Sequence, residues 1–238
     1  IYKKSVSATQ LDDLKSGGVD VLMGITGGDE TDEAVAACDN SNGAFVYTHY
    51  SRAGYGKLQF RNDYGPAQFT AVRQAITYCL DRASFAKTFT GGYGGVVDGA
   101  YYAGSWMYKE AAANGMLLNA YDTSADTAIA VLEADGWIYD ANGEPYVEGV
   151  RYKKIPAEYA DENDKTYKSI DGAYVTTKVG DDYYMPLVLN WYGTTDNPFS
   201  DLLVTDFEQG ANIAAAGIVI QKTTGDFNPM LDEFYQQA

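Results

Sequence analysis

The sequence predicts an α/β fold in which a mixed sheet is flanked by helices. The clearest indication is residues 58–82, where Leu58 and Phe60 alternate with polar residues as in a half-buried strand, and Gly65-Pro66 then breaks the pattern. A helix is predicted next, because apolar residues recur at spacings of three, four and seven: Phe69, Val72, Ile76, Cys79 and Leu80. Strand-like and helix-like segments also alternate through the rest of the chain, as expected for helices packed on a sheet.

The segments before residue 58 predict three strands, over 2–6, 19–23 and 44–51, and two helices, over 9–15 and 29–38. The first helix would place Leu11 and Leu14 inward and stop at Gly17-Gly18. Its spacing from the strands on either side predicts a parallel βαβ unit. The second helix begins with acidic residues, which the helix dipole favours in a first turn.

The segments after residue 82 predict helices over 85–89, 122–135, 197–216 and 227–237, with strands over 173–178, 184–192 and 218–220. Glycines at 91, 92, 94 and 95 predict a turn, and the aromatic segment 100–108 predicts a rigid loop. Thr123 and Asp126 have the spacing of a capping box.

The polar, tyrosine-rich residues 151–182 predict an inserted β-hairpin, which we assign to a β-rich insertion over 138–182. Pro186 cannot donate a ladder hydrogen bond, so the strand that contains it should start at an edge or a bulge.

Charge and composition exclude several classes of partner. The chain of 238 residues has 17 Lys and Arg against 33 Asp and Glu, a net charge of −16 spread along its length. Nucleic acids and anionic membrane surfaces attract basic patches, so neither is expected as a partner. No run approaches the roughly 18 apolar residues that span a bilayer, and no leader pattern is present. The chain begins at Ile1 without an initiator Met, which we interpret as a processed or excised piece.

Catalytic and metal-binding patterns are weak. The one histidine, His49, has no partner histidine or nearby cysteine, so we expect a strand residue and not a metal ligand. The acidic residues around Gly143 do not match a calcium loop and predict a turn. Cys79, on the apolar face of the central helix, predicts a buried free thiol and no disulfide with Cys38. We therefore expect no enzyme, no catalytic residue, no cofactor and no metal, although composition cannot exclude a glycosidase that needs only two carboxylates.

The segment VRQAITYCLDR resembles the signature of the family 5 extracellular solute-binding proteins, the oligopeptide and dipeptide receptors of ABC transporters. The matching positions are Val72, Arg73, Gln74, Ala75, Tyr78, Asp81 and Arg82. LEADGW at 132–137 resembles a family helix whose tryptophan packs under the lobe, and the helix, Gly-Ile, strand and helix after residue 197 follow the family order. The family usually has an aromatic residue, an Asp and an Arg where this chain has Ala67, Phe69 and Ala71, so Gln68 or Thr70 must cap the helix.

The resemblance implies a type II periplasmic-binding-protein-like lobe, with residues 1–238 as a partial second lobe. It implies binding of a small-molecule or peptide solute, an oligopeptide first of all, for uptake through an ABC transporter permease. It also implies an extracellular or periplasmic lipoprotein that meets the membrane only through an anchor absent from this chain. The ligand-binding residues that it implies are Tyr55, Lys57, Tyr93, Trp191, Tyr192, Thr194, Asp196 and Asn197.

The cargo and the class of function stay open at this point. The family also carries oligosaccharides and nickel chelates, and this lobe does not discriminate among cargoes. Without the first lobe, the chain alone is not expected to bind solute tightly. The alternatives are a cell-surface carbohydrate-binding or interaction module, favoured by the tyrosine-rich insertion, and a glycoside hydrolase.

Overall fold

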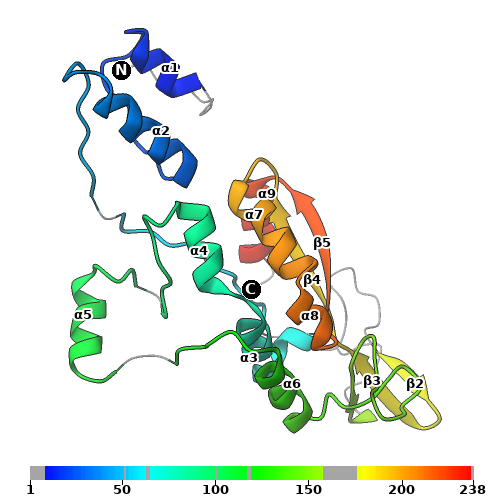
Figure 1. Cartoon of the computed structure of the whole chain (residues 1–238). Coiled ribbons are helices and arrows are strands. Elements are labelled where there is room, and N and C mark those ends of the chain that lie inside the picture. The colour runs from blue at the N-terminus through cyan, green and yellow to red at the C-terminus, as the bar shows by residue number, and fades with distance from the viewer. Residues whose placement is uncertain are drawn as a thin grey trace. The chain divides into compact units, whose positions relative to one another are not determined.

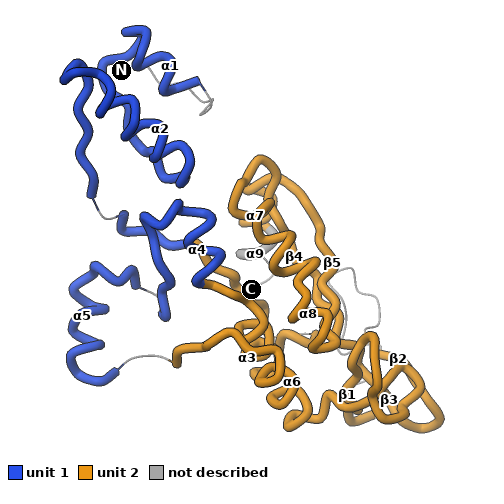
Figure 2. Tube along the Cα trace, viewed as in Figure 1, with its two compact units in different colours: residues 1–55, 83–117 blue, residues 56–82, 118–238 orange. Residues whose placement is uncertain are grey.

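The computed structural model describes residues 9–50, 52–62, 65–99, 101–116, 119–157 and 176–236. The chain divides into two compact units, coloured separately in Figure 2. Unit 1 comprises residues 1–55 and 83–117, and unit 2 comprises residues 56–82 and 118–238. Most of the helices and strands are labelled in Figure 1.

Unit 1 is helical in its described part. Its helices are α1 (Gln10–Lys15), α2 (Gly28–Asp39), α4 (Arg82–Thr90, whose first residue belongs to unit 2) and α5 (Trp106–Ala113). The start of α2 meets the turn after α4 at two glycines: a Cβ on Gly91 would lie 2.7 Å from the Cα of Gly28. Both positions need glycine because the two backbones touch. The helices predicted over 9–15, 29–38 and 85–89 are therefore confirmed.

Two of the three strands predicted in unit 1 fall on described residues, and neither is found there. Residues 19–23 and 44–50 are irregular, and the side chains of Val21, Met23 and Val46 are 72%, 75% and 89% exposed. An alternating pattern forms a strand only where a neighbouring strand accepts its backbone hydrogen bonds, and neither described segment has such a neighbour. The predicted βαβ unit at the N-terminus is therefore wrong in its second strand, and its first strand, 2–6, lies outside the described residues.

The predicted aromatic loop over 100–108 is also wrong in part. Ser105 caps α5 by accepting a hydrogen bond from the N–H of Tyr108, so the helix begins at Trp106. A serine followed by a helix-forming segment is a common start signal.

The core of unit 2 is the packing of α3 (Thr70–Cys79) on α6 (Ala125–Ala134). The apolar periodicity of both helices is confirmed, because the inward residues are buried: Val72, Ala75, Ile76, Cys79, Ala128, Leu132 and, just after α6, Trp137. The cap of α6 is Ser124, whose side chain accepts from the N–H of Thr127, and not the predicted box that begins at Thr123.

The segment before α3 differs from the predicted strand and helix cap. Residues 57–61 form no strand, and a short 3-10 turn, η2 (Pro66–Gln68), precedes the helix. Neither Gln68 nor Thr70 is the N-cap; Phe69 holds that position without a side-chain hydrogen bond. Arg73 instead donates to the carbonyl oxygens of Ala67 and Gln68, which ties the turn to the helix.

Unit 2 contains two separate sheets among its described residues. The first is antiparallel in the order β1-β3-β2, formed by β1 (Tyr152–Ile155), β2 (Thr177–Val179) and β3 (Asp182–Pro186). The second is parallel and joins β4 (Val188–Thr194) to β5 (Val219–Gly225). The hairpin predicted around residues 180–182 is thus present as β2 and β3. Residues 158–175, which include most of the predicted strand over 173–178, lie outside the described residues.

The strand predicted over 184–192 is split at Leu187, so that β3 and β4 belong to different sheets. The Leu187 N–H donates to the carbonyl of Arg151, and its carbonyl accepts from the N–H of Val219. At Leu187 the chain therefore leaves the sheet that contains β1 and begins to pair with β5.

The helix predicted over 197–216 is interrupted. It consists of α7 (Pro198–Leu203), a π-helical turn η5 (Val204–Glu208) and α8 (Ala211–Ala215). Gly210 breaks it, because its backbone is extended just before α8, and a Cβ there would also meet the carbonyl of Asp206. These helices connect β4 to β5 along the sheet (Figure 1), and the last helix, α9 (Phe227–Gln236), is confirmed. No helix in the described ranges is long and apolar enough to cross a membrane.

Candidate functional site

The carboxyl ends of β4 and β5 meet at one edge of unit 2. Thr194 lies opposite Gly225 in the parallel register, and the N–H of Thr195 donates to the Gly225 carbonyl at 2.9 Å. The Thr195 hydroxyl also donates to the carboxylate of Asp226 at 3.0 Å. In open α/β sheets, ligands bind beyond the carboxyl ends of parallel strands, so the geometry favours this edge as a site.

Two of the predicted residues hold this edge together. The amide nitrogen of Asn197 donates to the Thr194 hydroxyl at 2.7 Å, and its amide oxygen caps α7 by accepting from the N–H of Phe199 at 3.1 Å. Ser200 lies 3.3 Å from the same hydroxyl, and Thr194 and Ser200 are only 6% and 7% exposed. Thr194 and Asn197 therefore shape the turn, with their polar atoms engaged inside the protein.

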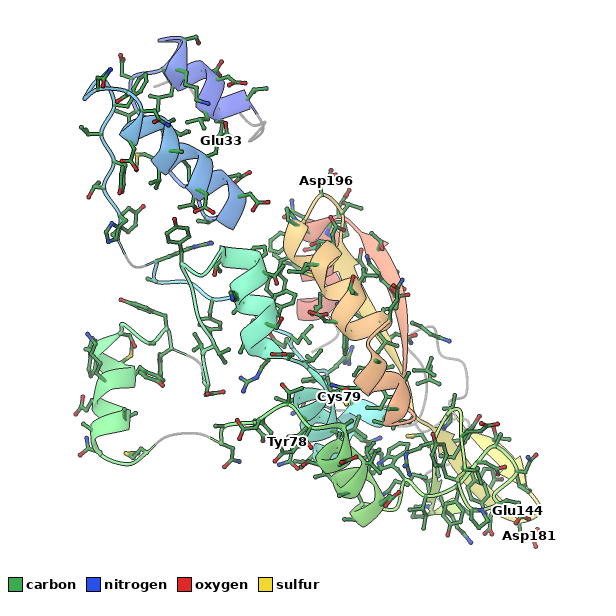
Figure 3. All side chains as sticks on the ribbon, in the orientation of Figure 1. Glu33, Tyr78, Cys79, Glu144, Asp181 and Asp196 are labelled. Atoms are coloured by element: carbon green, nitrogen blue, oxygen red, sulfur yellow. The ribbon has the colours of Figure 1, made fainter. Side chains whose placement is uncertain are left out.

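Asp196 is the predicted residue that faces solvent on this turn. Its φ of 51° places it in the left-handed region, which Asp and Asn tolerate better than most residues. Its side chain is exposed between β4 and α7, as Figure 3 shows. An exposed carboxylate here can accept hydrogen bonds from an amine or a hydroxyl of a bound molecule.

Trp191 and Tyr192 do not form one surface. They are successive residues of β4, so their side chains leave opposite faces of the strand. Trp191 packs edge to face on Phe207 of η5, with ring centroids 5.4 Å apart, and the Lys222 ammonium lies 5.3 Å from its ring. Tyr192 stays half-buried and its hydroxyl abuts Gly225, where a side chain would clash. Trp191 is thus a packing residue, whereas Tyr192 contacts the last residue of β5.

The remaining predicted residues lie in irregular segments. Tyr55 and Tyr93 belong to unit 1, where they are 43% and 61% exposed, and Lys57 is exposed in unit 2. The Tyr93 hydroxyl donates to the carboxylate of Asp32 at 2.8 Å, and this hydrogen bond raises the pKa of Tyr93 above its usual 10.0. Tyr93 is therefore held in place by α2.

Sequence reasoning missed Lys222, Ser200 and Asp226. Each reaches the edge only through the β4–β5 register or the start of a helix, as the contacts to Trp191, Thr194 and Thr195 show. A local pattern carries no information about such pairing. The signal that could have found Asp226 is its place directly after a predicted strand.

The turn predicted around Gly143 is confirmed, and Asp140 begins it. Desolvation acts to raise the pKa of Asp140, but hydrogen bonds from the N–H groups of Asn142 and Glu144 outweigh it, and the pKa is lowered. The carboxylate therefore organises its own loop. Within the described ranges, no group of three or more His, Cys, Asp or Glu side chains is placed to hold a metal ion.

The family model for bacterial extracellular solute-binding proteins, family 5 middle, matches residues 1–176. The chain belongs to this family. The resemblance of the central helix is thereby confirmed. A search of curated proteins found no match.

Solved structures of two transporter-associated binding proteins share the fold. An ABC transporter substrate-binding protein from Sinorhizobium meliloti is 17% identical with a TM-score of 0.51, covering 93% of this chain and 36% of that one. A periplasmic oligopeptide-binding protein from Thermotoga maritima is 11% identical with a TM-score of 0.51, covering 98% and 37%. This chain spans between 21% and 37% of the length of these and the other similar solved structures. The predicted α/β fold of the type II periplasmic binding proteins is confirmed.

Proposed function

We propose that the chain is part of the second lobe of an extracellular receptor that binds a solute and delivers it to an ABC transporter permease, without catalysing a reaction. Family membership supports the general role. In this proposal residues 138–182 are an insertion in the lobe, and the whole protein is held outside the cell or in the periplasm by a lipid anchor. A receptor of this kind traps its ligand by closing two lobes around it.

The observation that carries the proposal is the polar edge at the ends of β4 and β5. Thr194, Asn197 and Ser200 rigidify the turn through buried hydrogen bonds. They leave Asp196 exposed beside the Thr195–Asp226 pair. A rigid turn that presents a carboxylate suits a polar ligand, because the ordering cost of the site is already met in the free protein.

An oligopeptide is the cargo we favour. The Thermotoga maritima protein with the same fold is named as oligopeptide-binding, and a second structure of it is described with mannohexaose bound. Peptides offer an ammonium and main-chain N–H groups, which are the donors that an exposed carboxylate accepts. A neutral sugar would use the same carboxylate only through hydroxyl donors.

Thermal unfolding of the parent polypeptide with both lobes tests this function. Panels of short peptides, oligosaccharides and metal chelates are added at about 100 times the dissociation constant, which should stabilise the protein by about 2.7 kcal/mol. A shift with peptides alone supports the proposal. A shift with sugars that maps to residues 151–182 and survives loss of the first lobe would replace it with a surface carbohydrate-binding module.

The matched variants are Asp196→Asn and Asp140→Asn. Asparagine tolerates the left-handed backbone of Asp196 and removes only the charge. We expect Asp196→Asn to weaken peptide binding by about tenfold or more, since a charge-assisted hydrogen bond is lost. Asp140 lies on a separate turn and its variant should bind as the unmodified protein does. Equal affinity for both variants would remove Asp196 from the site.

A further inference from the structure

Asparagine is followed directly by glycine at three places: Asn42-Gly43, Asn114-Gly115 and Asn142-Gly143. All three asparagine side chains are exposed. Glycine has no side chain to shield its backbone nitrogen, so this nitrogen can attack the side-chain amide carbon of the asparagine before it. A hydrogen bond that holds the glycine N–H or the asparagine side chain opposes the attack, because it fixes the group in another direction. The surroundings of each pair therefore decide whether it reacts.

The pair at 114–115 is held at the end of α5. The side-chain amide of Asn114 donates to the carbonyl of Glu110 at 2.8 Å. The N–H of Gly115 donates to the carbonyl of Ala112 at 3.2 Å, as is common where a glycine follows a helix. Both reacting groups of this pair are therefore engaged.

The pair at 142–143 is held by Asp140. The carboxylate of Asp140 accepts from the side-chain amide of Asn142 at 3.3 Å. The carbonyl of Asp140 accepts from the N–H of Gly143 at 3.2 Å. The ring of Tyr184 also lies against Gly143, where a Cβ would come within 2.7 Å of it. This pair is thus engaged by hydrogen bonds and packed on one side.

The pair at 42–43 has neither restraint. It forms the centre of a tight turn just after α2, in which the N–H of Ala44 donates to the carbonyl of Ser41 at 3.1 Å. Asn42 and Gly43 both have positive φ, 52° and 86°, as the central residues of a type I′ turn do. Within the described part of the chain, neither the Asn42 side chain nor the Gly43 N–H makes a hydrogen bond. A Cβ on Gly43 would meet no atom within 4 Å, so the space around the pair is open.

We propose that Asn42 is a site of spontaneous deamidation and that the fold protects the other two pairs. The Gly43 nitrogen loses its proton and forms a bond to Cγ of Asn42. The bond from Cγ to the side-chain nitrogen breaks, and that nitrogen takes up a proton and leaves as ammonia. The resulting cyclic imide adds one water. Attack of the water at Cγ gives aspartate, and attack at the backbone carbonyl gives isoaspartate.

The product places a new negative charge beside the C-terminal end of α2. A carboxylate at that end of a helix opposes the helix dipole, and the last turn of α2 has no basic residue to offset it. Isoaspartate also adds a carbon atom to the backbone of the turn. The turn is bracketed by Ser41, whose hydroxyl donates to the carbonyl of Cys38 and accepts from the N–H of Phe45. We therefore expect the modified turn to loosen, whether or not a solute is bound.

Incubation of the 238-residue chain in mildly alkaline buffer, followed by peptide mapping with mass spectrometry, tests the proposal. Each pair is followed by the mass change from amide to carboxyl. We expect Asn42 to react about tenfold or more faster than Asn114 and Asn142, because those pairs must first break their hydrogen bonds. In denaturant the three rates should agree within about threefold, since the fold no longer distinguishes the pairs.

Variants at two positions separate the turn from the protection. Asn42→Gly keeps the turn, because glycine adopts the same positive φ, and it should abolish the rapid modification. Asp140→Ala removes the carboxylate that holds Asn142 and should raise the rate there about threefold or more. The matched control is Asp140→Asn, which keeps an acceptor and should change the rate less. Slow amide exchange in α3 and α6 shows that unit 2 of both Asp140 variants is folded.

Three outcomes would overturn the proposal. Equal rates at the three pairs in native buffer would mean that the fold does not select Asn42. The same ranking in denaturant would mean that local sequence, and not the fold, sets the rates. An unchanged rate at Asn142 in folded Asp140→Ala would mean that these hydrogen bonds do not protect. None of these results bears on the proposed solute-binding role, so the two proposals stand or fall separately.

Discussion

The guanidinium carbon of Arg151 lies 4.0 Å from the centre of the Tyr146 ring, inside unit 2. The side chain is only 4% exposed and donates to the carbonyl oxygens of Ala216 and Trp137, each at 3.0 Å. It also pairs with Glu133 at 3.2 Å. One buried cation therefore joins the end of α6 to the turn between α8 and β5.

Replacement of Arg151 by Met should destabilise unit 2 strongly. The apolar side chain leaves the two carbonyls without donors, and each unsatisfied buried group costs about 1–3 kcal/mol. We expect a loss of about 2–4 kcal/mol in the free energy of unfolding, measured by urea titration. The matched control is Lys154→Met, since Lys154 and its partner Asp182 are 47% and 44% exposed. Similar losses for the two variants would contradict the role of Arg151.

Arg151 also shows what sequence reasoning could not reach. It begins a polar stretch, so its residue type and neighbours indicate a surface position, yet the structure buries it. Its partners are up to 65 residues away in sequence, and they are backbone carbonyls that every residue carries. Helices α3 and α6 were predictable because their apolar spacing is a local property.

Strands and site residues were predicted less well for a related reason. The segments 19–23, 44–50 and 57–61 all alternate like strands, but alternation does not say which neighbour completes the ladder. The family resemblance implied both Trp191 and Tyr192 as ligand-binding residues, but adjacent side chains of a strand lie on opposite faces. Asp196 lies on an exposed turn, and its role in binding stays a prediction.

Asn197→Ala should destabilise α7 through loss of its cap. The amide oxygen of Asn197 accepts from the Phe199 N–H, and replacing such a cap by alanine costs about 1 kcal/mol. Asn197→Asp keeps an acceptor and loses only the donor to Thr194, so its effect should be smaller. Thermal unfolding of both variants measures the difference. If the two variants lose equal stability, the bond to Thr194 carries the effect and the cap contributes little.

Cys79 should resist thiol reagents in the folded protein. Burial raises its pKa to about 12, so at about pH 8 only about one thiol in ten thousand is ionised. Cys38 is half-buried, and both cysteines are free. We expect one rapid modification, at Cys38, and a second only after unfolding.

A Cys38→Ser variant provides the control for this measurement. It should show no rapid modification in native buffer and one modification in denaturant. Rapid labelling of Cys79 in this variant would mean that α3 opens readily on the timescale of the reaction.

Tyr93 should lose its hydroxyl proton at a higher pH than an ordinary tyrosine. Its hydrogen bond to Asp32 favours the protonated hydroxyl, and the pKa lies above 10.0. Above that pH an unfolded chain loses the proton while the folded chain keeps it, so the stability contributed by this bond falls as pH rises through the folded pKa. The difference in ultraviolet absorbance between the unmodified protein and Tyr93→Phe isolates this one group among the 21 tyrosines.

Asp32→Asn tests the cause of the shift. Without the carboxylate, the pKa of Tyr93 should return toward 10.0, while α2 keeps its other acidic residues. If the difference spectrum of the unmodified protein is already centred at 10.0, the hydroxyl is free in solution. Tyr93 would then be available to a solute, and its assignment as a residue held by α2 would be wrong.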